Sequence, residues 1–144
     1  MSHRQEYHTS VRWESQRKGE VSAPELSDLT VATPPHFPGG HGGIWSPENL
    51  FVASIESCIM TTFLAIAENS KLEFKEYRSM AEGIVEKTEG GYVFTEVTVK
   101  PVVVIGKEKD RDRTLRILNK SERACLVSRS VKTPIHLEPE AVVA

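Results

Sequence analysis

The chain has 144 residues, a length that one hydrophobic core can stabilise as a single domain. It carries 18 Lys and Arg against 20 Asp and Glu, a formal net charge of -2, so it lacks the excess of basic residues typical of nucleic-acid binding. The longest uninterrupted apolar stretch, Pro101 to Gly106, is far shorter than the roughly 20 residues of a membrane span, and Met1 to Ser10 lack the apolar run of a secretory signal. We therefore expect one domain, residues 1–144, in the cytoplasm, with no nucleic-acid or membrane partner.

The first third of the chain is predicted to contain short strands and a loop. Polar and bulky residues alternate from Tyr7 to Trp13, and Gln16–Gly19 is typical of a turn, so the chain is expected to open with a hairpin. One or two further short strands are expected within Val21–Val31. The segment Thr33–Gly43 holds three prolines and four glycines and is predicted to be a loop. It lacks the Gly-Lys-Ser/Thr ending of a phosphate loop, so flexibility is the simpler explanation of its glycines.

The clearest signal is a long helix that follows Ser46. Ser46 offers a capping hydroxyl, Pro47 suits the first helical position, and Glu48 places a carboxylate in the first turn. No Gly or Pro interrupts the chain from there to Glu68 or Asn69. Small side chains recur along this helix at three- and four-residue spacing: Ala53, Ser54, Ser57, Cys58, Thr61 and Ala65. Such a stripe allows another helix to approach closely, so we expect the helix to be central and well buried.

Two long strands are expected next. Phe74–Lys87 and Tyr92–Ile105 flank Thr88–Gly91, which is a hairpin signal. Pro101 lies within the second of these strands. Because proline cannot donate to a ladder, it predicts an edge position or a bulge.

The remainder of the chain is predicted to form a second helix and a last strand. The helix is expected at roughly Asp110–Ser130, with Leu115, Leu118 and Cys125 on one face. The strand is expected within Pro134–Val143. On these assignments both cysteines lie inside helices.

Cys58 and Cys125 are the two cysteines of the chain, 67 residues apart. They form no CxxC pattern and have no paired-histidine partner, so a zinc site is poorly supported and we expect no metal and no cofactor. A mixed site with His36 or His41 is conceivable, but loop packing and solvation explain these histidines more simply. Cytoplasmic cysteines are usually reduced, so this pair is either inert core or redox-active.

Three segments together resemble the organic hydroperoxide resistance/OsmC family. Ser46–Phe51, leading into Cys58, is similar to the Pro-Glu-x-Leu-(Leu/Phe)-x-Ala…Cys helix of that family. Cys125, with a serine three residues later, is similar to its Cys-Pro-x-Ser segment. Gln16–Gly19 is similar to its Gly-Arg-(Asp/Glu)-Gly turn. The resemblance extends from about Thr9 to Ala141, and the order and spacing of the landmarks agree.

The chain also departs from the family pattern. Leu126 stands where the family often has proline, and Ser15 and Gln16 replace the glycines before the arginine. Glu56 and Ser57 are more polar than the usual residues before the first cysteine. These differences leave the subfamily open, and with it the natural hydroperoxide and the physiological reductant.

The resemblance implies an α+β fold in which a single OsmC-like domain, with two long helices and antiparallel sheets, forms an intertwined homodimer with two interfacial active sites. It also implies a thiol-dependent peroxidase that reduces organic hydroperoxides in oxidative-stress defence. Cys58 would attack the O–O bond and become a sulfenic acid, which Cys125 would convert to a disulfide. A dithiol reductant, for which the family suggests a lipoyl protein, would restore both thiols.

The resemblance further assigns Arg17 and Glu48 to the site. Burial of Cys58 would raise its pKa, so a fixed cation is expected to offset the burial and favour the thiolate. Arg17 would supply that cation and hold the peroxide oxygen, while Glu48 would clamp the guanidinium. The alternatives are that Arg17 is a solvated turn cation, Glu48 only a helix-dipole carboxylate, and Cys125 a core residue of a one-cysteine enzyme.

Two other functions stay open. A non-catalytic OsmC-like binding or stress scaffold would leave the pKa of Cys58 ordinary, whereas a peroxidase needs it lowered. A protein disulfide oxidoreductase would need an exposed sulfur, which a mid-helix position does not favour. For a peroxidase, the loop residues Phe37, Ile44 and Trp45 predict a preference for alkyl hydroperoxides over hydrogen peroxide, because an alkyl tail can bury against them.

Overall fold

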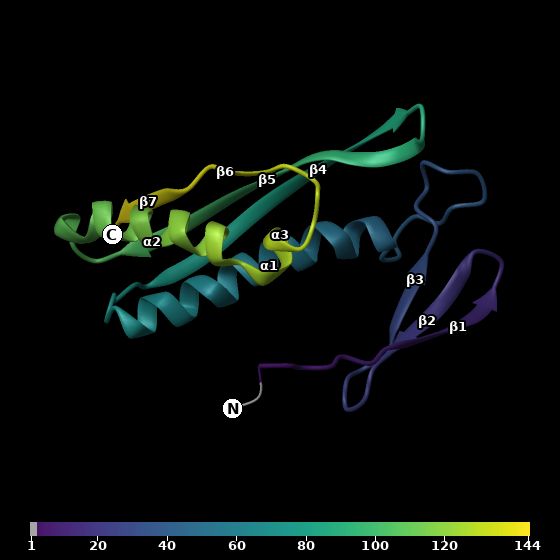
Figure 1. Cartoon of the computed structure of the whole chain (residues 1–144), viewed down its shortest axis with the longest axis horizontal. Helices are drawn as coiled ribbons and strands as arrows, with labels where there is room; N and C mark the ends of the chain where they lie inside the picture. The colour runs from purple at the N-terminus through teal and green to yellow at the C-terminus, as the bar shows by residue number, and fades with distance from the viewer. Residues whose placement is uncertain (1–2) are drawn as a thin grey trace. The chain divides into compact units, whose positions relative to one another are not determined.

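The computed structural model describes residues 3–144, in which strands and helices are mixed in one α+β chain (Figure 1). The chain divides into two compact units, the first ending at Phe51 and the second comprising Val52–Ala144. The elements, in chain order, are β1 (Ser10–Ser15), β2 (Lys18–Ser22), β3 (Leu29–Ala32), α1 (Pro47–Asn69), β4 (Glu76–Thr88), β5 (Gly91–Ile105), the 3-10 turn η1 (Glu108–Asp110), α2 (Arg111–Ala124), α3 (Leu126–Arg129), β6 (Ile135–Leu137) and β7 (Glu140–Val143).

The first unit contains a three-stranded antiparallel sheet in the order β1-β2-β3. The expected hairpin is confirmed as β1 and β2, and its turn places Arg17 between them. Gln16 adopts a left-handed φ of 51°, and its carbonyl accepts a hydrogen bond from Trp13 Nε1 at 3.0 Å. This hydrogen bond joins the turn to a side chain of β1, so the backbone next to Arg17 is fixed by the strand that precedes it.

The start of α1 agrees with the sequence prediction. The backbone N–H of Asn49 donates to Ser46 Oγ at 3.1 Å, and the backbone N–H of Ser46 donates to Asn49 Oδ1 at 3.0 Å. This reciprocal arrangement is a capping box in which an asparagine replaces the usual Glu or Gln. It satisfies two free donors at the helix end and positions Glu48 in the first turn.

The buried face of α1 differs from the one expected. The fully buried residues recur every four positions and are three large apolar ones, Ile55, Ile59 and Phe63, followed by Ala67. Within the stripe of small residues, Ser57, Thr61 and Ala65 are exposed. Large side chains bury more apolar area, so they pack on the core of the same chain, and these three small residues stay on the surface.

Helix α1 is also long and apolar enough to cross a membrane by length and composition. Its sequence contains no long uninterrupted apolar run, because Ser, Thr and Glu are interspersed among the apolar residues. Its fully buried Ile55, Ile59 and Phe63 pack as in the core helix of a globular domain. Of its most apolar 18-residue window, 22% is buried in the single chain.

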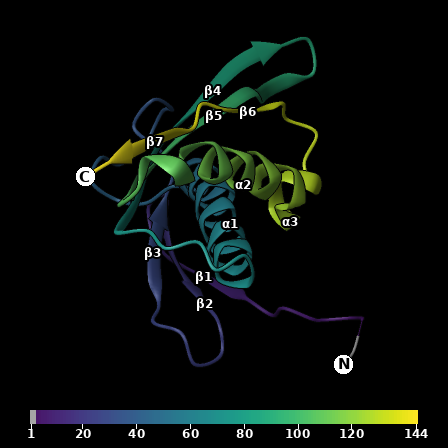
Figure 2. The same cartoon turned by 90° about the vertical axis from the view of Figure 1, so that its left-hand side faces the viewer.

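The second unit is built on the antiparallel β4–β5 hairpin, which confirms the two long strands and their turn. Strand β5 also pairs in parallel with β6 and then with β7, so the expected last strand is two short ones. Helices α1 and α2 lie on the same face of this sheet (Figures 1 and 2). Phe63 of α1 packs edge-on against Phe74 and tilted against Tyr77, with ring centroids 5.3 and 5.2 Å apart.

The expectation that Pro101 marks an edge strand or a bulge is wrong, because β5 is central and pairs regularly at this residue. The carbonyl of Val99 accepts a hydrogen bond at 2.9 Å from Glu138, on the side of β6 and β7. Backbone groups two residues apart in a strand face the same side, so the N–H that Pro101 lacks faces the gap between β6 and β7. No ladder donor is needed there.

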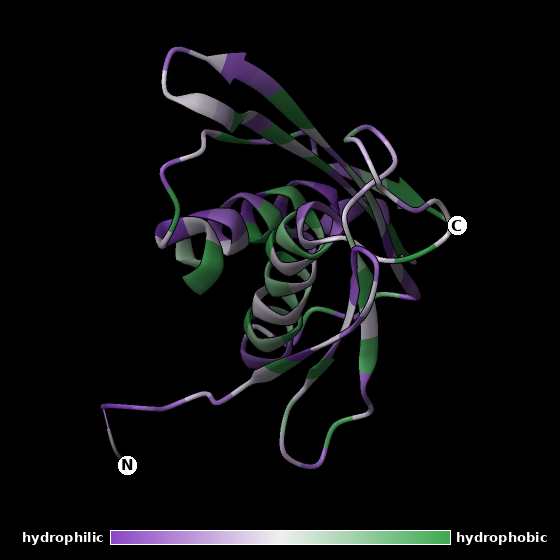
Figure 3. Ribbon diagram, turned by 90° about the vertical axis from the view of Figure 1, so that its right-hand side faces the viewer, coloured by the Kyte–Doolittle hydropathy of each residue, from purple (hydrophilic) through white to green (hydrophobic). Residues whose placement is uncertain are grey.

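The second predicted helix is interrupted. Helix α2 ends at Ala124, Cys125 is extended with φ -61° and ψ 119°, and α3 begins at Leu126. Cys125 therefore lies at a junction between two helices and not inside one, contrary to expectation. Figure 3 shows α1 in mostly apolar and neutral colours, whereas α2 alternates with strongly hydrophilic residues. The buried residues of α2 are Thr114, Ile117, Leu118 and Ser121, the apolar members of which join the core around Phe63.

Candidate active site

Cys125 caps the short helix α3. Its Sγ accepts a hydrogen bond at 3.4 Å from the backbone N–H of Ser128, and its side chain is fully buried. Burial and the hydrogen bond that its thiol donates to Cys58 raise the pKa of Cys125, although contacts with Ser128 act in the opposite direction. Cys125 thus stays a protonated thiol and acts as a hydrogen-bond donor.

Cys58 is half-buried and lies against this junction. Burial favours the neutral thiol, but hydrogen bonds from Cys125, from the backbone of Val127, from the Thr62 side chain and from the backbone of Leu126 outweigh it and lower the pKa of Cys58. The N–H groups in the first turn of a helix have no partner within it, so the break at Cys125 makes them available to a sulfur. The two cysteines are free thiols in mutual hydrogen-bond contact.

This geometry bears on one expectation from the sequence. A fixed cation was expected to offset the burial of Cys58, and hydrogen bonds within the second unit also lower its pKa. Direct hydrogen bonds to a thiolate favour the charged form as a nearby cation does. The role of Arg17 at the thiol stays a prediction.

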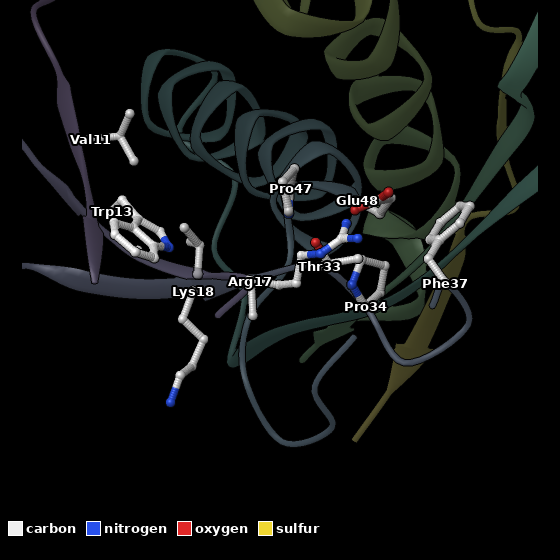
Figure 4. Close-up of a pocket in the computed structure, with 12 residues that line it drawn as sticks. Val11, Trp13, Arg17, Lys18, Thr33, Pro34, Phe37, Pro47 and Glu48 are labelled. Carbon is white, nitrogen blue, oxygen red and sulfur yellow. The ribbon is translucent and has the colours of Figure 1, made fainter. Parts of the chain in front are cut away.

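Arg17 and Glu48 line a cavity of about 440 Å³ in the first unit. In Figure 4 the guanidinium extends toward the carboxylate, while the Lys18 ammonium points away. Within residues 3–144 the two groups form no ion pair, and Glu48 Oε1 is buried without a hydrogen-bond partner. A buried carboxylate oxygen is costly to leave unsatisfied, so this cavity is suited to a donor that approaches it. The clamp of Arg17 by Glu48 stays a prediction.

The cavity wall is largely apolar. Phe37 of the proline- and glycine-rich loop contributes to it, whereas Ile44 and Trp45 are not among its lining residues. Val11 and Trp13 of β1 complete the apolar wall. Sequence reasoning missed these two residues, although their spacing of two within a strand places them on one face.

A model of the OsmC-like protein family matches residues 40–140. The chain belongs to the OsmC-like protein family. The matched region contains both cysteines and Glu48, whereas Arg17 lies before it. The resemblance noticed in the sequence is therefore confirmed at the level of the family.

One curated protein is similar in sequence over most of its length, and solved structures share the fold. The chain is 24% identical over 140 residues to the uncharacterized protein YmaD of Bacillus subtilis, with 95% of this chain and 93% of that protein covered. An OsmC-like protein of unknown function from Vibrio cholerae superimposes with a TM-score of 0.85 at 25% identity, covering 94% of this chain and 99% of that one. An organic hydroperoxide resistance protein from Elizabethkingia anophelis, solved with thiocyanate bound, superimposes with a TM-score of 0.77 at 18% identity, and both chains are fully covered.

Three donors around the thiolate of this OsmC-like protein were missed in the sequence. Thr62 follows Cys58 by four residues on the same helix face, so helical spacing would have identified it. The backbone N–H groups of Leu126 and Val127 gave no signal, since neither residue type marks a helix break. Among residues 3–144, no cluster of three or more His, Cys, Asp or Glu side chains is arranged to hold a metal ion.

Proposed function

We propose that this protein is a cytoplasmic thiol peroxidase that reduces organic hydroperoxides in defence against oxidative stress. The carrying observation is the set of hydrogen bonds that converge on the Cys58 sulfur, with Cys125 in contact with it, and these bonds lower the pKa of Cys58. The thiolate is the nucleophilic form of cysteine, and a non-catalytic scaffold has no need of this shift. Membership of the OsmC-like family and the fold shared with an organic hydroperoxide resistance protein support the same class of reaction.

The proposed reaction has two oxidative steps. The Cys58 thiolate attacks the outer oxygen of the hydroperoxide, the O–O bond breaks, and an alkoxide leaves that takes up a proton to become the alcohol. Cys58 is then a sulfenic acid. The thiol of Cys125, already in hydrogen-bond contact, displaces hydroxide from it to form a disulfide and water. An external dithiol, for which a lipoyl protein is the proposed carrier, reduces the disulfide by exchange.

Arg17 is proposed to bind the peroxide and stabilise the leaving alkoxide, and Glu48 to aim the guanidinium. The unpartnered Oε1 of Glu48 supports this role, because it can accept a hydrogen bond when the guanidinium closes on it. The apolar wall formed with Val11, Trp13 and Phe37 supports an alkyl or aryl tail on the substrate.

Helix geometry suggests that the site is shared between two copies of the chain. Glu48 and Cys58 are ten residues apart on α1, which corresponds to about 15 Å along the helix axis. An arginine held at Glu48 is then poorly placed for the sulfur of its own chain. The exposed stripe of Ser57, Thr61 and Ala65 supports close packing of a second copy, because small side chains let helix backbones approach. We propose a homodimer in which Arg17 of each copy serves Cys58 of the other.

A mixing experiment tests this arrangement. Arg17→Ala and Cys58→Ser chains are each inactive alone, are unfolded and refolded together, and the heterodimer is isolated with two affinity tags. If Arg17 acts across the interface, one site of the heterodimer is intact and about half of the wild-type rate with cumene hydroperoxide returns. An inactive heterodimer would show that Arg17 acts within its own chain, and a monomer in light scattering would exclude the shared site.

The rival functions give other results in two assays. A peroxidase consumes cumene hydroperoxide in proportion to added dithiol, and Cys58 alkylation shows a pH midpoint below that of an ordinary thiol. A binding scaffold would fail both assays. A protein disulfide oxidoreductase would reduce a scrambled protein substrate faster than it reduces the hydroperoxide.

A further inference from the structure

The loop that precedes α1 packs against the Arg17 side chain through Gly39. A Cβ added to Gly39 would lie 3.3 Å from Nε and 3.4 Å from Cγ of Arg17. The separation from Nε is tighter than most Cβ contacts and the one from Cγ is at the lower limit of ordinary contact, so a side chain at this position would require the arginine to shift by a few tenths of an ångström. Gly39 also has a φ of 78°, in the left-handed region that favours glycine.

Backbone hydrogen bonds hold Gly39 in this place. The N–H of Thr33 donates to the carbonyl of Arg17 at 3.2 Å, and the N–H of His41 donates to the carbonyl of Thr33 at 2.9 Å. Two further bonds, at 3.1 and 3.0 Å, close successive turns within Pro34–Gly40. Gly39 thus lies in a segment whose geometry is fixed by backbone hydrogen bonds.

We infer that Gly39 is a positioning residue whose backbone sets the direction of the Arg17 guanidinium in its cavity. The inference rests on the proposed peroxidase function, in which that guanidinium contacts the substrate. A methyl group at Gly39 would displace Nε by a few tenths of an ångström, and the guanidinium beyond it would move further. Catalytic groups tolerate about half an ångström of misplacement, so the contact with the peroxide would weaken while the thiol pair is unchanged.

Two other glycines of the same loop provide matched controls. Gly43 has a φ of 76°, yet among residues 3–144 and apart from its chain neighbours no atom lies within 4 Å of its added Cβ. Gly42 is equally open and has no left-handed φ. Gly39→Ala therefore combines backbone strain with contact, Gly43→Ala introduces strain alone, and Gly42→Ala introduces neither.

The kinetic test compares these three variants. We expect Gly39→Ala to lower kcat/KM for cumene hydroperoxide about tenfold with an unchanged pH midpoint of Cys58 alkylation, and Gly42→Ala and Gly43→Ala to stay within about twofold of wild type. In an Arg17→Ala background, Gly39→Ala should cause no further loss, because the two changes act through one group. An equal loss in Gly43→Ala, or additive losses with Arg17→Ala, would overturn the inference.

A readout without turnover separates this inference from the proposed function. The Nε–H signal of Arg17 in a nitrogen-15 correlation spectrum is assigned by its disappearance in Arg17→Lys. We expect this signal to shift in Gly39→Ala and to stay in place in Gly42→Ala and Gly43→Ala. An unshifted signal in Gly39→Ala overturns the positioning role even if the wild-type protein reduces peroxide. An inactive wild-type protein whose signal shifts refutes the peroxidase and leaves the packing confirmed.

Discussion

The thiol pair of the second unit and the arginine cavity of the first differ in how their polar groups are satisfied. Around Cys58, four hydrogen-bonding groups converge on one sulfur and favour its charged form. Around Arg17, the guanidinium and Glu48 share a cavity, and within the described part of the chain they form no ion pair and Glu48 Oε1 is buried with no hydrogen-bond partner. A cluster whose polar groups already have hydrogen-bond partners keeps its geometry before substrate binds. A buried polar group without a partner gains the most hydrogen-bond energy when a donor or a substrate enters the cavity. We therefore propose that the thiol pair is activated before substrate arrives and that the arginine cavity contacts the substrate.

The largest expected effect separates the two cysteines. Cys58→Ser should reduce peroxidase turnover by about 10³-fold or more, because no thiolate is left to attack the O–O bond. Cys125→Ser should still consume one equivalent of hydroperoxide and accumulate the sulfenic acid of Cys58. Dimedone trapping followed by mass spectrometry measures that intermediate. The pairing of Cys58 with Cys125 would be contradicted if every disulfide in the peroxide-treated wild-type protein were intermolecular.

The next effect tests the division of roles directly. Arg17→Ala should lower kcat/KM by about 10²- to 10³-fold through lost transition-state contact, and Glu48→Ala should cost less because it only loosens the aim. Neither variant should move the pH midpoint of Cys58 alkylation. Lys18→Ala is the matched control, since Lys18 lines the cavity but points away from Glu48. If Arg17→Ala raises the pH midpoint of Cys58 alkylation, Arg17 does lower the pKa of the thiol and the proposed division of roles is wrong.

A smaller effect concerns the substrate tail. Cumene hydroperoxide should react about ten- to fiftyfold faster than hydrogen peroxide, since two or three buried methylenes contribute about 0.8 kcal/mol each. Trp13→Ala and Phe37→Ala should narrow that ratio because both residues line the cavity. Trp45→Ala, outside the lining residues, should leave it nearly unchanged. Competition kinetics measures the ratio, and equal rate constants for the two peroxides would refute the apolar subsite.

The smallest effect probes one hydrogen bond at the thiol. Leu126→Pro removes a backbone N–H directed at Cys58, at a first helical position where proline fits. The pKa of Cys58 should rise by less than about one unit, as one hydrogen bond contributes roughly 0.5–1.5 kcal/mol. The midpoint of alkylation against pH reports this change. The thiolate stabilises the fold above the unfolded pKa of Cys58, and this contribution is lost as pH falls through the lower folded pKa. Leu126→Pro should therefore lose part of this contribution to stability. An unchanged alkylation midpoint would show that the backbone N–H of Leu126 does not stabilise the Cys58 thiolate.

Local sequence determined much of the architecture of this protein. The helix cap at Ser46, the turn at Gln16 and the hairpin around Thr88 depend on neighbouring residues, and the structure has all three where expected. The family resemblance likewise rested on short motifs around Cys58 and Cys125. These features are encoded within a few residues, so local rules are sufficient to identify them.

The remaining features of the fold and of the candidate site depended on contacts between distant segments. The donors that the break at Cys125 provides to Cys58, and the packing of Gly39 on Arg17, each join segments more than 20 residues apart. Pro101 was misassigned for the same reason, because the gap it faces is formed by β6 and β7, more than 30 residues later. Hydrogen-bond partners and space around a side chain are set by which surfaces meet, so only the tertiary structure could decide them.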